Sequence, residues 1–133
     1  MQHGFNEVQV ELEGNLVICI PDGAFNLEGV QEYEVNFAKQ IANFKGQKWG
    51  ILNIYDTYET GGPEVQERVT TQFKWSVKNG CAFIGFVVHN PLHEYAAKHT
   101  TKGLNAEVKI FHKDKVEAFK WIREALANAN QTA

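Results

Sequence analysis

Three polar residues that follow apolar segments have side chains able to take part in acid–base or nucleophilic chemistry. Asp56 and Thr57 follow the segment 49–55, and His89 follows the segment 81–88. A hydroxyl, an imidazole and a carboxylate are the groups that form a nucleophile–base–acid arrangement. The sequence has no Gly-x-Ser-x-Gly turn, which is the motif that exposes a nucleophile in α/β hydrolases. We therefore predict no catalytic residue and place a hydrolase third among three functional hypotheses.

Five histidines raise the question of a metal site. His89 and His93 are four residues apart, a spacing that places two ligands on one face of a helix. Asn90 and Pro91 lie between them, and the residue before a proline avoids helical geometry. A His-Glu-x-x-His motif beginning at His93 would need a second histidine at position 97, which is alanine. The sequence therefore predicts neither a metal ion nor any other cofactor.

Periodicity along the chain predicts the elements that position these residues. Alternating polarity indicates a strand with one exposed face, and longer apolar runs indicate buried strands. Apolar residues at helical spacing, capping residues and Pro63 indicate the helices. The predicted strands are 8–12, 16–20, 49–55, 81–88 and 106–111, and the predicted helices are 26–46, 63–79, 92–101 and 114–127.

Three of these strands, 16–20, 49–55 and 81–88, are apolar on both faces and should lie inside a sheet covered by helices on each side. Crossovers through helices make such strands parallel and right-handed. The sequence thus predicts an α/β fold of the order β-β-α-β-α-β-α-β-α. Its sheet is mixed and five-stranded, with an N-terminal antiparallel hairpin and about four helices. We expect a single domain over residues 1–127 and a frayed C-terminal tail over 128–133.

The carboxyl ends of parallel strands are where open α/β sheets bind ligands and partners. The segment 56–62 is polar, contains two glycines and leads into a helix whose first N–H groups have no partner within the helix. The residues predicted to contact a partner or ligand at this edge are Asp56, Thr57, Tyr58, Thr60, His89 and Asn90.

Trp75 is a seventh predicted contact residue. The helix that begins at Pro63 has an apolar stripe, formed by Val65, Val69, Phe73 and Val77. At about 100° per residue, Trp75 falls away from this stripe and is expected at the surface. Tryptophan is enriched at protein contacts, although it can also lie against a neighbouring helix or strand. In the helix 92–101, the candidates for the core are Leu92, Tyr95, Ala96 and His99.

The order of the elements and several local features resemble the SpoIIAA-like proteins, relatives of the STAS domains that include the anti-sigma-factor antagonists. The features are Gly14-Asn15, the segment 25–29, Trp49, the segment 56–63, Gly80-Cys81 and Trp121. The resemblance implies a regulatory or ligand-binding domain without catalysis of its own. It also implies a phosphorylatable serine in an Asp-Ser-Ser-Gly-like stretch where the third strand enters its helix. The matching segment 56–62 contains no serine, which argues against a phosphoryl switch of the antagonist type.

Some SpoIIAA-like proteins also resemble lipid carriers, which makes a small apolar ligand the alternative hypothesis. Such a ligand would lie between the sheet and its covering helices. The aromatic residues that could line this space are Phe25, Phe37, Phe44, Tyr55 and Phe73, although aromatic residues at such positions commonly form plain core.

Composition narrows the choice of partner and compartment. Lysine and arginine number 13 against 16 aspartates and glutamates, so the chain has no basic excess with which to bind nucleic acid. No apolar run approaches the roughly 20 residues needed to span a membrane, and the first residues do not resemble a signal peptide. Cys19 and Cys81 lie in or beside apolar runs, as buried thiols of a reducing compartment would. We therefore expect a cytoplasmic, non-enzymatic domain that binds another protein or a second copy of itself.

Overall fold

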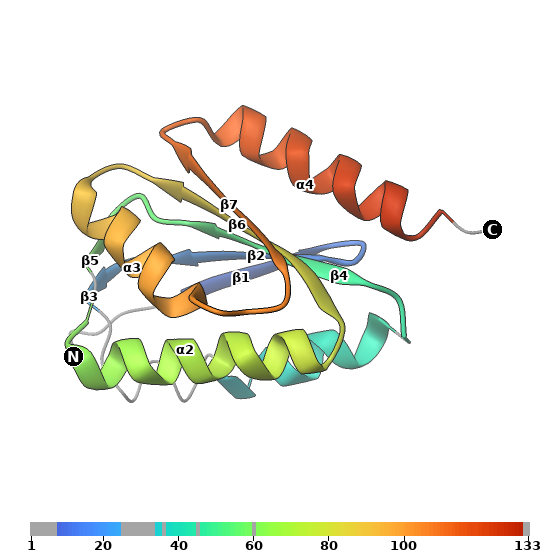
Figure 1. The fold of residues 1–133 in the computed structure, drawn as a ribbon, viewed down its shortest axis with the longest axis horizontal. Helices are drawn as coiled ribbons and strands as arrows, with labels where there is room; N and C mark the ends of the chain where they lie inside the picture. The colour runs from blue at the N-terminus through green and yellow to red at the C-terminus, as the bar shows by residue number, and fades with distance from the viewer. Residues whose placement is uncertain (1–7, 25–33, 36, 45, 60, 132–133) are drawn as a thin grey trace.

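The structure of the chain, a computed structural model, describes residues 8–24, 34–35, 37–44, 46–59 and 61–131. In these residues five strands form one sheet in the order β1-β2-β4-β6-β7. The first pair is antiparallel and the other three pairs are parallel (Figure 1). The strands are β1 (Val8–Glu13), β2 (Leu16–Pro21), β4 (Trp49–Ile54), β6 (Cys81–Val88) and β7 (Glu107–His112). The predicted mixed sheet is confirmed, and the three apolar strands lie inside it.

The hairpin between β1 and β2 has the geometry that its sequence predicts. Gly14 has a φ of +60°, whereas Asn15 is not among the described residues with a positive φ. A type II′ turn requires a positive φ at its first central residue alone, which glycine adopts without steric cost.

Helices cover both faces of the sheet (Figure 1). On one face, α2 (Pro63–Lys78), α3 (Pro91–Thr101) and residues 37–44 pack against the strands. On the other face lies α4 (Lys115–Ala129). Ala118, Ile122 and Leu126 form the buried stripe of α4. The two hydrophobic layers explain why the central strands are apolar throughout.

The predicted first helix is described in part. Residues 34–35 and 37–41 are helical and lead into the 3-10 turn η1 (Ala42–Phe44), whereas the predicted start at Asn26 lies outside the described residues. Gly46 then has a φ of +83°, as expected for the left-handed residue that ends a helix.

The last helix continues through Ala129, past the predicted end near residue 127. Asn130 holds this end in place. Its Oδ1 accepts from the N–H of Lys48 at 3.1 Å, and its Nδ2 donates to the carbonyl of Lys48 at 2.9 Å. These two bonds attach the end of α4 to the residue that precedes β4.

The side of α3 that faces the sheet differs from the expected one. Leu92 and Tyr95 are 58% and 63% exposed, and the buried residues are His93, Ala96, Ala97, Thr100 and Thr101. The threonine hydroxyls donate to backbone carbonyls one turn earlier, which satisfies them inside the core. A buried face can therefore be built from small and polar side chains when each polar group finds a partner.

A second, two-stranded sheet lies beside the first. β3 (Gly23–Ala24) pairs in parallel with β5 (Tyr58–Glu59). The segment 56–62, expected to be a loop, thus contains a short strand. Among the described helices, none has the length and apolar character needed to cross a membrane.

Cys19 and Cys81 are both buried, and neither is part of a disulfide. Burial raises the pKa of the Cys81 thiol to about 12, so the thiol stays protonated at neutral and mildly alkaline pH. We expect native protein at pH 8 to show no rapid reaction with the reagent DTNB, and two thiols to react once the chain is unfolded in guanidinium. Rapid reaction of one thiol in the native state would contradict this arrangement.

Candidate functional site

The carboxyl ends of β2, β4 and β6 meet along one edge of the sheet. The residues that follow these strands are Asp22, Asp56, Thr57, His89 and Asn90, which we call the rim. Asp22, Asp56, Thr57 and Asn90 are exposed, and His89 is half-buried. The structure thus brings together the polar groups that the order of the strands predicted to share one edge.

The two corners after β2 and β4 are joined by backbone and side-chain hydrogen bonds. The N–H of Gly23 donates to the carbonyl of Thr57 at 3.1 Å, next to the β3–β5 pairing. The hydroxyl of Thr57 donates to a carboxylate oxygen of Asp22. These bonds hold Asp22 and Thr57 at fixed positions although both side chains are open to solvent.

His89 connects the ends of β4 and β6. Its Nδ1 lies 2.8 Å from the carbonyl oxygen of Tyr55, which can only accept, so Nδ1 carries the proton of this bond. The second ring nitrogen, Nε2, then lies 3.8 Å from a carboxylate oxygen of Asp56. This distance is too long for a hydrogen bond but allows an ion pair when the imidazole is protonated.

His93 lies beneath the rim with 2% of its surface exposed. Its Nδ1 accepts from the N–H of His89 at 3.2 Å, so Nε2 carries the ring proton and donates to the carbonyl of Tyr58 at 2.7 Å. The ring also packs against the side chains of Tyr55 and Tyr58. Both ring nitrogens are thus engaged, and His93 ties the start of α3 to β5 and to the residue after β6.

Asn90 has a structural task at the rim. Its side-chain oxygen accepts from the N–H of His93 at 2.8 Å and caps the first turn of α3. The cap aligns the imidazole of His93 with its two backbone partners. Asn90 therefore contributes to the shape of the rim as well as to its surface.

Tyr58 lies inside the molecule, with 5% of its surface exposed. Pairing of β5 with β3 turns its ring inward, where it contacts the ring of Tyr55 at a centroid distance of 4.5 Å. Burial raises the pKa of the Tyr58 hydroxyl above its usual value. Tyr58 supports the rim from below and does not present its ring to solvent. Thr60 lies outside the described residues.

Trp75 lies far from the rim along α2. Twelve residues separate it from Pro63, where the helix begins, which corresponds to about 18 Å at 1.5 Å per residue. Its side chain is 37% exposed and meets the ring of Phe37 edge-on at 6.5 Å. The structure therefore separates Trp75 from the other predicted contact residues.

The ionisable side chain at the end of β7, His112, pairs with a carboxylate of α3. Nε2 of His112 lies 3.0 Å from Glu94, which also pairs with Lys98 at 2.9 Å. Hydrogen bonds from His112 and Lys98 hold the pKa of the Glu94 carboxyl below its usual value. At the ends of β2 and β4, by contrast, Asp22 and Asp56 form no ion pair with a lysine or arginine of the described residues.

The geometry does not pair the hydroxyl of Thr57 with the imidazole of His89 as a nucleophile and its base. The hydroxyl of Thr57 donates to Asp22, and within the described part of the chain no hydrogen bond joins Thr57 to His89. Over the same residues, no group of three histidine, cysteine, aspartate or glutamate side chains is placed to hold a metal ion. The rim is suited to hydrogen bonding and charge pairing at a surface.

The aromatic residues considered as the lining of an apolar ligand site form part of the core. Phe37, Phe44, Tyr55 and Phe73 are all buried in the cluster between the sheet and α2. They contact other rings, such as Trp49 and Phe86, at centroid distances of 5.3–5.9 Å. Phe25 lies outside the described residues.

Comparison with known proteins shows which solved structures have a similar fold. No protein-family model and no curated protein matches the sequence. Among solved structures, an uncharacterised DUF3478-family protein with a SpoIIAA-like fold from Shewanella loihica PV-4 matches with a TM-score of 0.70 and 13% identity. The match covers 92% of this chain and 98% of that one.

Two anti-sigma factor antagonists are also similar. The antagonist from Mycobacterium paratuberculosis gives a TM-score of 0.62 at 12% identity, over 90% of this chain and 95% of that one. The antagonist SpoIIAA in its unphosphorylated form gives 0.65 at 10% identity, over 87% and 97%. The chain therefore has a SpoIIAA-like fold, as the resemblance in its sequence predicts.

Proposed function

We propose that this chain is a non-catalytic, protein-binding domain of regulatory type that uses the rim as its contact surface. The observation that carries the proposal is the network beneath the rim. Backbone partners fix His89 and His93, and the Thr57–Asp22 bond fixes the corner between β2 and β4. A surface whose polar groups are held in place loses little conformational entropy when it binds.

The charge of the rim indicates the chemistry of the partner. Asp22 and Asp56 are exposed, and Glu59 adds a third exposed carboxylate on β5. The imidazole of His89 is the ionisable group that faces Asp56. We infer a partner that presents lysine or arginine side chains to these three carboxylates, because complementary charge speeds association and selects the partner.

The fold supports this function by analogy, since two of the similar structures are anti-sigma factor antagonists. Control by phosphate in the segment 56–62 is not part of the proposal. The segment contains no serine, and a phosphate on Thr57 would lie beside the carboxylates of Asp22 and Asp56. We place the protein in the cytoplasm, where two buried thiols that form no disulfide stay reduced.

Charge reversal at the rim tests the proposal. Proteins captured on immobilised wild-type chain are identified, and the dissociation constant of each is then measured with purified components. We expect Asp56→Lys to raise the dissociation constant of the specific partner at least about tenfold, because the new ammonium group repels the basic surface of that partner. The matched control is Glu124→Lys, which makes the same charge change at an exposed position of α4 on the other face of the sheet.

A partner that tolerates both substitutions equally would contradict the rim as the contact surface. A second copy of this chain is one outcome of the same experiment, and sedimentation of the purified protein identifies it. A turnover of acyl or phosphoryl substrates that depended on Asp56 or His89 would overturn the non-catalytic function.

A further inference from the structure

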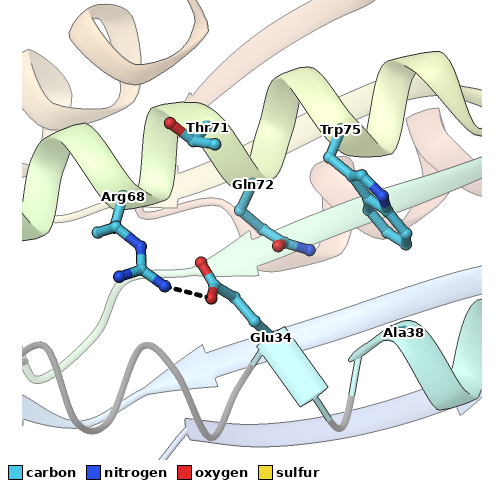
Figure 2. Close-up of a pocket in the computed structure, with 6 residues that line it drawn as sticks. All are labelled: Glu34, Ala38, Arg68, Thr71, Gln72 and Trp75. Atoms are coloured by element: carbon cyan, nitrogen blue, oxygen red, sulfur yellow. Dashed lines mark hydrogen bonds and ion pairs between the residues drawn. The ribbon is translucent and has the colours of Figure 1, made fainter.

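A pocket of about 360 Å³ lies along α2, next to the helical residues 34–35 and 37–38 and apart from the rim. Figure 2 shows side chains of α2 extending toward the segment that carries Glu34 and Ala38. The volume falls in the range of sites that hold small molecules. The pocket is lined by Glu34, Ala38, Arg68, Thr71, Gln72 and Trp75.

Gln72 is the unusual member of this lining. Its side chain is 94% buried, and its amide nitrogen has no hydrogen-bond partner. By contrast, the buried hydroxyl of Ser76, one turn later, donates to the carbonyl of Gln72 at 2.9 Å. An unpartnered buried N–H group destabilises the fold unless an acceptor reaches it, and a bound oxygen atom would supply that acceptor.

The charged residues of the pocket neutralise each other. A guanidinium nitrogen of Arg68 lies 2.6 Å from a carboxylate oxygen of Glu34, so this end of the pocket has no net charge. A guanidinium group has five N–H donors, and this bond uses one of them. The pocket therefore offers hydrogen-bond donors without net charge, which suits a neutral ligand that carries acceptor oxygens.

Trp75 and Ala38 give the pocket an apolar wall. The indole is held edge-on against Phe37 and is 37% exposed, so one part of its surface is open to a ligand. A flat ring is the apolar group that packs best against an indole. This wall accounts for the partial exposure of a tryptophan that sequence periodicity assigned to a protein contact.

We propose that the pocket binds a small, uncharged aromatic molecule that carries a carbonyl oxygen. The ring lies against Trp75 and Ala38, and the side-chain amide of Gln72 turns toward the pocket so that its nitrogen donates to the carbonyl oxygen. The proposal does not depend on the protein-binding function of the rim, because no rim residue lines this pocket.

A pair of probes that differ in the carbonyl oxygen tests the proposal. Acetophenone and ethylbenzene are titrated into ¹⁵N-labelled full-length protein at equal concentrations, up to the solubility of ethylbenzene. We expect acetophenone to bind roughly tenfold more tightly, because it alone can accept from Gln72. The largest shifts should be those of the backbone of residues 68–75, the Gln72 amide and the Trp75 indole.

Two variants assign the preference to Gln72. Gln72→Met keeps the length of the side chain and removes the donor, so both probes should then bind with similar, weak affinity. The matched control is Gln66→Met on the same helix, which makes the same substitution at a side chain that does not line the pocket. It should leave the preference for acetophenone unchanged.

Equal binding of the two probes to the wild type would overturn the proposal, and so would shifts centred on the rim. An unchanged preference in Gln72→Met would do the same. Trp75→Leu gives an independent check should Gln72→Met fail to fold, because it removes the flat face of the indole at a partly exposed position. The substitution should weaken the binding of both probes, and undiminished binding of both would also overturn the proposal.

Discussion

Replacement of His93 by leucine is expected to lower the free energy of unfolding by roughly 2–4 kcal/mol. The imidazole satisfies two backbone groups, the N–H of His89 and the buried carbonyl of Tyr58. Leucine fills much of the volume but can bond to neither group, so both lose their partner inside the protein. Urea denaturation of wild type and variant, followed by circular dichroism, measures the change.

His99→Leu is the matched control for this prediction. His99 lies on the exposed side of the same helix, where its ring stacks on Tyr95. Because no buried group loses a partner there, we expect a change within about 0.5 kcal/mol. Similar losses for the two variants would show that the helical position, and not the bonds of the imidazole, determines the cost.

Replacement of Trp49 by alanine is expected to lower the free energy of unfolding by about 3–5 kcal/mol. Trp49 is 1% exposed, contacts Phe37 and Phe44, and donates from its indole nitrogen to the carbonyl of Asn79 at 2.8 Å. The substitution leaves a large cavity and an acceptor without its donor. The free energy of unfolding is measured by guanidinium denaturation with circular dichroism, which does not depend on the removed fluorophore.

Trp75→Ala provides the comparison for Trp49→Ala. Its side chain is 37% exposed and meets Phe37 alone among the rings of the described residues, so we expect a loss of about 1 kcal/mol or less. A loss for Trp75→Ala as large as that for Trp49→Ala would contradict the assignment of Trp49 to the core and Trp75 to a surface pocket.

The sheet could be predicted because its central strands carry an unambiguous pattern. The apolar runs of β2 and β6 leave no polar face for solvent, which requires an interior position. The face of α3 could not be predicted in this way, because its buried residues are small or polar. Their spacing at positions 93, 96, 97 and 100 is nevertheless helical, and this signal is visible once polarity is ignored.

The rim could be predicted in part. The rule for parallel strands brought Asp56, Thr57 and His89 to one edge, because it depends on strand order alone. The burial of Tyr58 depends on the pairing of β5 with β3, which two-residue strands do not reveal in a sequence. The contact between Asp22 and Thr57 follows from the same pairing.

The pocket on α2 could not be predicted from polarity, because glutamine is an ordinary surface residue of helices. Gln72 lies seven residues after Val65, however, and seven residues return almost to the same side of a helix. Its place on the buried side of α2 was therefore encoded in its spacing. What the sequence could not reveal is that its amide nitrogen would find no partner there.

The two outer strands of the sheet bear on how the protein behaves in concentrated solution. An open strand edge can recruit the strand of another molecule, which is the first step toward ordered aggregates. β1 exposes Glu11 and Glu13 along its length, and β7 exposes Glu107 and Lys109 at alternate positions. A second chain approaching either border would have to bury these charges, so the native state is protected against growth by addition of strands.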